Sequence, residues 1–172
     1  MPDGQPTALT TAVADAVLAR LQTADFTGTP LADAEIVRAA GAADEKHRLP
    51  TRLVRVLALQ SETAEPTLSS RETTTVAVQV ELLAKLARTE GPAGDVSSRD
   101  PASIDPLSLE LQRLADTLRL RGLPLLGTDP ATGAAYGTAM YAGRREVTDA
   151  DPDLLRNNVF AGGFRVLYQV VR

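Results

Sequence analysis

The sequence predicts an α+β domain: an antiparallel or mixed β-sheet of about four to five strands, joined by long hairpins and flanked by two main α-helices. Apolar residues recur every three to four positions over 9–21 and 107–118, which is the spacing of amphipathic helices. Apolar and polar residues alternate over 73–82 and again over 159–171, which is the period of half-buried strands. These two periods, in this order, define the predicted fold class.

Length and composition fit one globular domain. The chain has 172 residues, of which 44% are hydrophobic and 23% charged, and it can bury a substantial core. Aromatic residues make up only 3%, so Val, Leu and Ala must build that core. We expect one domain over residues 1–172, with a flexible amino terminus over 1–6 and a long loop over 88–105.

The charge balance and the amino terminus bear on partners and location. With 18 Lys and Arg against 22 Asp and Glu, the net charge of −4 lacks the basic excess of domains that grip nucleic-acid phosphates. No apolar stretch is long enough to span a bilayer. The first residues are acidic and resemble no secretory signal. We expect a soluble cytoplasmic chain with no membrane partner.

Two helices have recognisable ends. The first is predicted from about Thr7 to Thr23 and ends in a turn over 26–30. The second is predicted to start at Asp105 and Pro106, which fit the N-cap and first helical position, and to close at Gly122–Pro124. Its apolar face is predicted from four leucines: Leu107, Leu111, Leu114 and Leu118.

The remaining apolar runs predict strands. Residues 35–38 form a short candidate strand, with a helix as the alternative because Ala residues flank the run. Residues 53–59 form a strand with both faces covered, because only Arg55 interrupts the apolar run. A run over 135–142 precedes the closing strand over 159–171. A straight strand over 72–86 would measure about 50 Å, more than the diameter of a compact domain of this size, so we expect a bend or a projecting hairpin. Gly162–Gly163 could place a bulge in the last strand.

The residue types give no sign of an active site, a metal site or a cofactor site. The absence of Cys excludes thiolate chemistry, and no Gly-x-Ser-x-Gly motif accompanies His47, the one histidine, which reads as a solvated loop residue. Asp149, Asp151 and Asp153 lack the rest of a calcium loop, and Asp151–Pro152 is predicted to open a single helical turn.

Other polar groups read as turns or isolated charges. Gly127–Pro130 and Thr132–Gly133 are turn signals without a phosphate-loop motif. Arg144–Arg145 is expected at the tip of the last hairpin, as a solvated turn. Glu81 and Glu110 form no carboxylate pair that could be placed in one cleft.

The order of these elements resembles the tail terminator (tail-completion) proteins of long-tailed bacteriophages. The resemblance is carried by an amino-terminal helix, the strand from Arg71 to Leu82, a long amphipathic helix and the closing strand over 159–168. It covers about Ala8 to Arg172 and concerns layout more than sequence. The insertion over 90–103, before the second helix, departs from the family layout.

The resemblance implies a structural virion protein, not an enzyme, without a cofactor. It implies a homo-hexameric ring that caps the tail tube, stops its polymerisation and joins the tail to the capsid neck. The implied partners are further copies of the chain, the tail tube protein and a neck or connector protein, at the tail–neck junction of the virion. The resemblance also implies that DNA passes through the ring as cargo. An acidic balance suits such a channel, since six copies at −4 give a formal charge of about −24, which opposes phosphate binding.

Exposed strand edges are the expected joining surface between copies. The predicted interface residues are Thr74, Val76, Gln79, Arg144, Arg145, Phe160 and Arg165. Three alternatives stay open: a head–tail connector or neck protein, a tube subunit, and a cytoplasmic oligomeric enzyme subunit. The enzyme would have its site between protomers, in a pocket lined by Tyr136, Tyr141 and Arg144.

Overall fold

A computed structural model of the chain describes residues 8–39, 50–64, 73–86, 101–119, 122–147 and 159–171. Its helices are α1 (Ala8–Gln22), the 3-10 helix η1 (Pro30–Asp33) and α2 (Pro101–Leu118). Its strands are β1 (Glu35–Ala39), β2 (Arg52–Ala64), β3 (Thr73–Lys85), β4 (Leu123–Pro124), β5 (Thr138–Val147) and β6 (Val159–Val171). The fold is α+β, as predicted.

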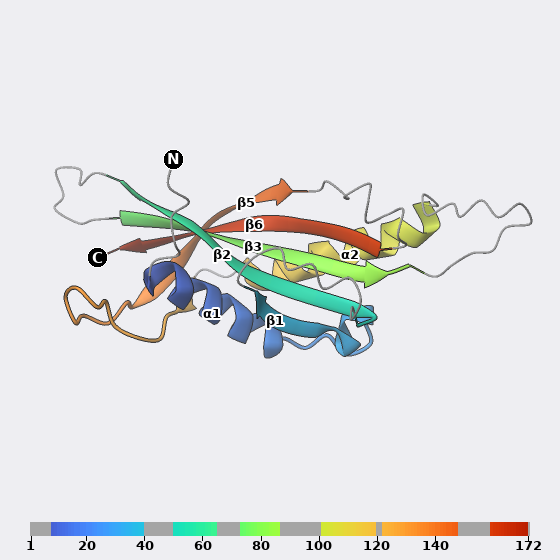
Figure 1. The fold of residues 1–172 in the computed structure, drawn as a ribbon, viewed down its shortest axis with the longest axis horizontal. Coiled ribbons are helices and arrows are strands. Elements are labelled where there is room, and N and C mark those ends of the chain that lie inside the picture. Colours follow the sequence, from blue (N-terminus) through green and yellow to red (C-terminus); the bar gives the residue numbers. More distant parts are fainter. Residues whose placement is uncertain are drawn as a thin grey trace, which may run out of the picture.

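The six strands form one strongly curled sheet in the order β1-β2-β3-β6-β5-β4 (Figure 1). It is a mixed sheet because β1 runs parallel to β2 while the other neighbours are antiparallel. The sheet has one strand more than the upper end of the predicted number. The extra strand is β4, whose two residues pair with Thr138 and Ala139.

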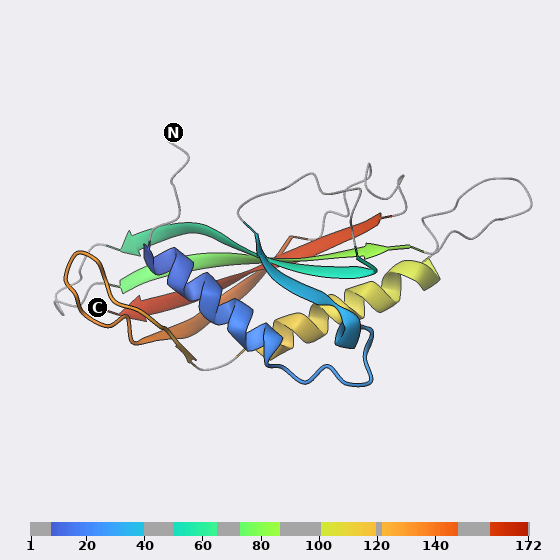
Figure 2. The same cartoon turned by 60° about the horizontal axis from the view of Figure 1, so that its bottom comes forward.

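Both helices cover the same face of this sheet (Figure 2). The strand residues on that face are buried, and they are the ones that share a parity in β3 and β6, as the alternation predicted. They include Val76, Val78, Val80 and Leu82 of β3 and Phe160, Phe164, Val166, Tyr168 and Val170 of β6. From α1 the core receives Leu9, Val13, Val17 and Leu21. The helix-covered face therefore holds the core.

The start of α2 corrects the sequence-based prediction. The helix begins at Pro101, five residues before Pro106, so the last part of the predicted loop over 88–105 is helical. Pro106 lies inside the helix and cannot donate a backbone hydrogen bond there. The helix continues past it, and Ile104, two residues before Pro106, packs against the core that contains Leu107 and Leu111. Residues 88–100 of that loop lie outside the described residues.

The predicted bulge at Gly162–Gly163 is also wrong. The β3–β6 register runs without a shift from Thr73–Val171 to Lys85–Val159. Irregularities lie instead between Ala58 and Ser61 of β2 and between Tyr141 and Gly143 of β5. A Cβ atom at Gly162 would lie 2.8 Å from Leu111 Cδ1, and one at Gly163 would lie 2.8 Å from the Val80 carbonyl oxygen. The two glycines allow close approach of α2 and β3 to β6.

Because Gly162 and Gly163 have different neighbours, we expect alanine substitutions at the two positions to lower the free energy of unfolding by different amounts. Gly163→Ala is expected to cost about 2 kcal/mol of unfolding free energy, because the Val80 oxygen belongs to the backbone and cannot move without disturbing the ladder. Gly162→Ala is expected to cost about half as much, because the ends of the Leu111 and Phe160 side chains can yield. Urea denaturation of both variants measures this, and equal costs would contradict the argument.

Two further predictions about the last third of the chain change. Leu123–Pro124, expected to close the second helix, forms β4. Arg144 and Arg145, expected at a hairpin tip, lie within β5. The turn signals at 127–133 are confirmed: Gly127 and Gly133 have φ of 101° and 69°, and Asp129 Oδ1 accepts a hydrogen bond from the Ala131 amide. The turn predicted at Asp151–Pro152 lies outside the described residues.

Candidate interaction surfaces

The face of the sheet opposite the helices carries a chain of polar contacts across three strands. Arg55 Nε of β2 lies 3.7 Å from Glu81 Oε2 of β3. Gln79 Nε2 donates to Glu81 Oε1 over 2.6 Å, and Arg165 Nε of β6 donates to Gln79 Oε1 over 3.2 Å. One register position further, Arg145 of β5 stands opposite Arg165. We call the four linked residues Arg55, Glu81, Gln79 and Arg165 the polar ladder.

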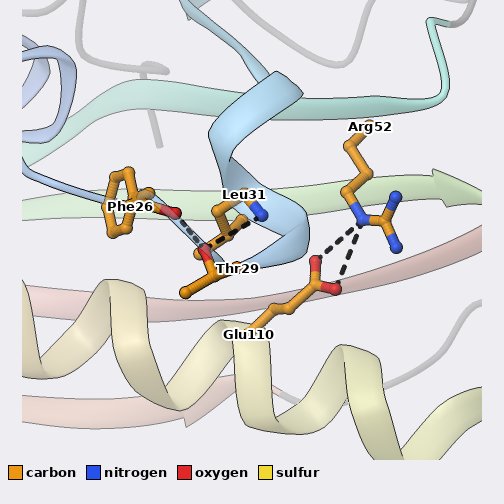
Figure 3. A network of polar contacts seen from close by, with 5 residues as sticks. All are labelled: Phe26, Thr29, Leu31, Arg52 and Glu110. Carbon is orange, nitrogen blue, oxygen red and sulfur yellow. Dashed lines mark hydrogen bonds and ion pairs between the residues drawn. The ribbon is translucent and has the colours of Figure 1, made fainter.

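A buried ion pair lies on the helix-covered face. Arg52 at the start of β2 donates through Nε to Glu110 of α2, at 3.1 Å from Oε2 and 3.3 Å from Oε1. The Glu110 side chain is 1% exposed and that of Arg52 is 28% exposed. Figure 3 shows the pair beside η1, with the two terminal nitrogens of Arg52 pointing away from Glu110. The pair links β2 to α2. It also gives the Glu110 carboxylate, which is buried among apolar side chains, a hydrogen-bond donor and a counter-charge.

The sequence itself carries a signal that Glu110 needs a buried partner. Glu110 lies three residues after Leu107 and four before Leu114, so it falls on the apolar stripe of the predicted helix. A carboxylate at such a position requires a cation or several hydrogen-bond donors when the stripe is buried. The identity of the cation depends on which strand crosses α2, which the sequence pattern does not give.

A pocket of about 380 Å³ opens where α1 ends and η1 and β1 follow. Its apolar lining includes Leu21, Phe26, Leu31 and Ile36. The turn is held by Thr29, whose hydroxyl donates to the Phe26 carbonyl and accepts from the Leu31 amide (Figure 3). Gln22 Nε2 donates to the Ile36 carbonyl over 3.0 Å.

Asp25 gives this pocket a fixed negative charge. Hydrogen bonds from the Thr27 hydroxyl and amide lower the pKa of the Asp25 carboxyl below its usual value. The Thr27 amide lies 2.9 Å from Asp25 Oδ1. The carboxylate is therefore ionised at neutral pH and presents a negative charge beside the apolar lining.

The structure places the predicted interface residues in different environments. Thr74, Val76 and Phe160 are at most 4% exposed and belong to the core, which corrects their assignment to a surface. Gln79 and Arg165 lie together in the polar ladder. Arg144 is on β5, and its Nη1 donates to Gln112 of α2 over 3.0 Å. Arg145 has a defined place in the β5 register, but its side chain lies outside the described residues.

The structure also places the other candidate site residues that the sequence offered. Glu81 and Glu110 lie on opposite faces of the sheet, each beside an arginine, and form no carboxylate pair. Tyr136, Tyr141 and Arg144 contact different neighbours: Gly127 lies near the Tyr136 ring, Tyr141 packs edge-on against Tyr168 at 6.2 Å, and Arg144 bonds Gln112. Within the described ranges no cluster of three His, Asp or Glu side chains could hold a metal ion. His47 and Asp149–Asp153 lie outside them.

Comparison of the chain with models of known protein families finds no match, and comparison with curated proteins finds no similar sequence. Among the described helices none has the length and apolar character needed to cross a membrane.

Proposed function

We propose that this chain is a ring-forming structural subunit of the tail terminator type, found at the tail–neck junction of a long-tailed bacteriophage. Its described elements follow the order that the resemblance implies: a first helix, strands β1 to β3, the long helix α2 and the closing pair β5 and β6. The α+β fold, with two helices on one sheet, agrees with that layout.

The observation that carries the proposal is the open, curled sheet with helices on one face and a strand edge at each side. At one side stands β1, paired only with β2 among the described strands. At the other side β4 pairs with the first two residues of β5, and within the described residues no strand pairs with the outer edge of β5 from Met140 to Val147. Such a subunit has two different surfaces through which copies can join in a closed ring.

In this proposal the ring acts by shape. It binds the end of the tail tube, occupies the surface to which the next tube subunit would add, and offers its other side to a neck protein of the capsid. DNA passes through the ring as cargo. The net charge of −4 for each copy keeps the assembly from binding the phosphate backbone tightly.

Electron microscopy of tail tubes tests the proposal. Tubes polymerised from the tube protein of the same virus are incubated with the purified chain and then supplied with further tube protein. We expect a sixfold ring at one end of each tube and arrested growth at that end. Absence of end-bound rings at tenfold molar excess, or unchanged tube growth, would overturn it. Unlimited polymerisation of the chain alone would favour a tube subunit, and a twelvefold complex with a portal would favour a connector.

A further inference from the structure

One end of the sheet, along the direction of its strands, is almost free of charge. At this end β3 and β5 begin and β6 finishes, since Ala139 pairs with Val170. Among the described side chains that β3, β5, β6 and the segment around β4 place there, the one charged group is the Asp129 carboxylate, which is buried. We call this region, residues 73–77, 122–143 and 167–171, the uncharged end.

Charged side chains begin where the uncharged end stops. The polar ladder and Arg144 lie across the middle of the sheet, and Arg52 and the exposed Lys85 stand at the far end of β2 and β3. Glu62 of β2 is placed opposite Thr75 by the register, and its side chain, like Arg172, lies outside the described residues. The two ends of the strands therefore offer surfaces of different chemistry.

Three large apolar side chains are exposed at the uncharged end. Leu126 is 87% exposed, Val171 50% and Met140 47%. Met140 and Val171 lie on the sheet face opposite the helices, because the residues next to them in β5 and β6 are buried on the helix-covered face. Single exposed apolar residues are common on proteins, whereas several gathered in one uncharged region mark a contact surface.

The segment that carries Leu126 is an ordered hairpin over 125–137. The Leu125 amide donates to the Gly137 carbonyl over 2.9 Å. Leu125 and Tyr136 are buried and attach the hairpin to the core, while Leu126 between them in the chain points to solvent. Figures 1 and 2 show this segment, in orange, at the same end of the molecule as the carboxyl end of β6. A side chain held in place in this way loses little conformational freedom when it binds.

We propose that the uncharged end is the surface through which this chain binds the end of the tail tube, with Leu126 as its central contact. The identity of the partner rests on the proposed function. In the proposed ring the copies join through strand edges at the two sides of the sheet. The ends of the strands lie away from those joints and face what the ring binds.

The difference in charge favours the tube over the neck as the partner of this end. In a growing tube, each layer is covered permanently by the next, and permanently covered surfaces are more apolar than surfaces that meet after a period in water. A ring that takes the place of the next layer needs such an apolar surface. The side that waits in water for the capsid needs a charged one. The uncharged end also offers no described cation to nucleic-acid phosphates.

Co-sedimentation with tubes polymerised from the tube protein of the same virus measures the contact. Leu126→Asp is expected to weaken binding to tube ends about thirtyfold, the loss typical of a central contact. Wild-type binding should be equal at 50 mM and 0.5 M salt, because salt screens charge pairs and not apolar contacts.

Two matched controls change other exposed residues. Leu109→Asp makes the same substitution at a leucine of α2 that is 54% exposed, and Lys85→Glu changes the far end of the strands. Both variants should bind tubes as the wild type does. Circular dichroism checks that every variant is folded.

Equal binding of Leu126→Asp and wild type, or wild-type binding that falls about tenfold at 0.5 M salt, would overturn this inference and leave the proposed function standing. Wild-type protein that does not bind tubes would overturn both. Sedimentation velocity and binding to the neck protein test the other occupants. A folded Leu126→Asp variant that no longer forms rings would assign the uncharged end to contacts between copies. One that keeps tube binding and loses neck binding would assign it to the neck, and either result would overturn the inference.

Discussion

Arg52→Met is expected to lower the free energy of unfolding by about 3 kcal/mol, because it leaves the Glu110 carboxylate buried without its cation. Removing one partner of a buried pair typically costs about 3–5 kcal/mol, and the 28% exposure of Arg52 places this pair at the lower end of that range. Urea denaturation at neutral pH measures the change. The effect concerns the joint between β2 and α2, so it should leave the far side of the sheet intact.

Two comparisons separate the buried charge from lost packing. Glu110→Leu together with Arg52→Met should recover most of the loss, since apolar residues of similar volume can replace a buried ion pair. Asp15→Ala removes the ion pair between Asp15, whose side chain is 59% exposed, and Arg38, whose side chain is 25% exposed. Because both side chains are partly solvated, the loss should lower the free energy of unfolding by only about 0.5 kcal/mol. Arg52→Met and Asp15→Ala with equal small costs would show that Glu110 is well hydrated after all.

The fold was largely predictable from the sequence because its core follows two simple periods. The recurrence of apolar residues every four positions, at Leu9, Val13, Val17 and Leu21, predicted both ends of α1 to within one residue. The alternation in β3 and β6 identified which side chains face the helices. Short local motifs predicted the ends of the elements less well than these long patterns predicted the elements themselves. Asp105–Pro106 looked like a helix start, but Asp100–Pro101 presents the same pair one turn and a half earlier.

Features that depend on contacts between distant segments were not predictable. The pair Phe160 and Gly162 faces α2, and Gly163 faces the β3 backbone, so the glycines serve packing where a bulge was expected. Thr74 and Val76 were assigned to an interface between copies although they share the apolar parity of β3, and the structure buries them with the rest of that parity. The polar ladder needs Arg55 and Arg165 to flank β3, a register set by the whole sheet.

Tyr168→Ala is expected to cost about 4 kcal/mol of unfolding free energy, the second large effect. The side chain is 1% exposed, and its ring packs edge-on against Tyr141 at 6.2 Å. Its hydroxyl donates to the carbonyl oxygen of Leu118, the last residue of α2, over 3.2 Å. Truncation leaves a cavity between β6 and α2 and removes this link. Tyr168→Phe keeps the ring and should cost about 1 kcal/mol at neutral pH, the net value of a single hydrogen bond.

Stability measurements at alkaline pH separate the contribution of the Tyr168 hydroxyl from that of its ring in a second way. Burial, with a smaller contribution from Tyr141, raises the pKa of the Tyr168 phenol above its usual value near 10. The folded protein thus favours the neutral phenol, so the stability it contributes is present below pH 10 and is lost as pH rises above 10. Wild-type protein should then lose about 1.4 kcal/mol more per pH unit than Tyr168→Phe between pH 10 and 11.5. Denaturation curves of both proteins across this range measure the difference, and parallel losses would mean that the phenol is accessible to solvent in the folded chain.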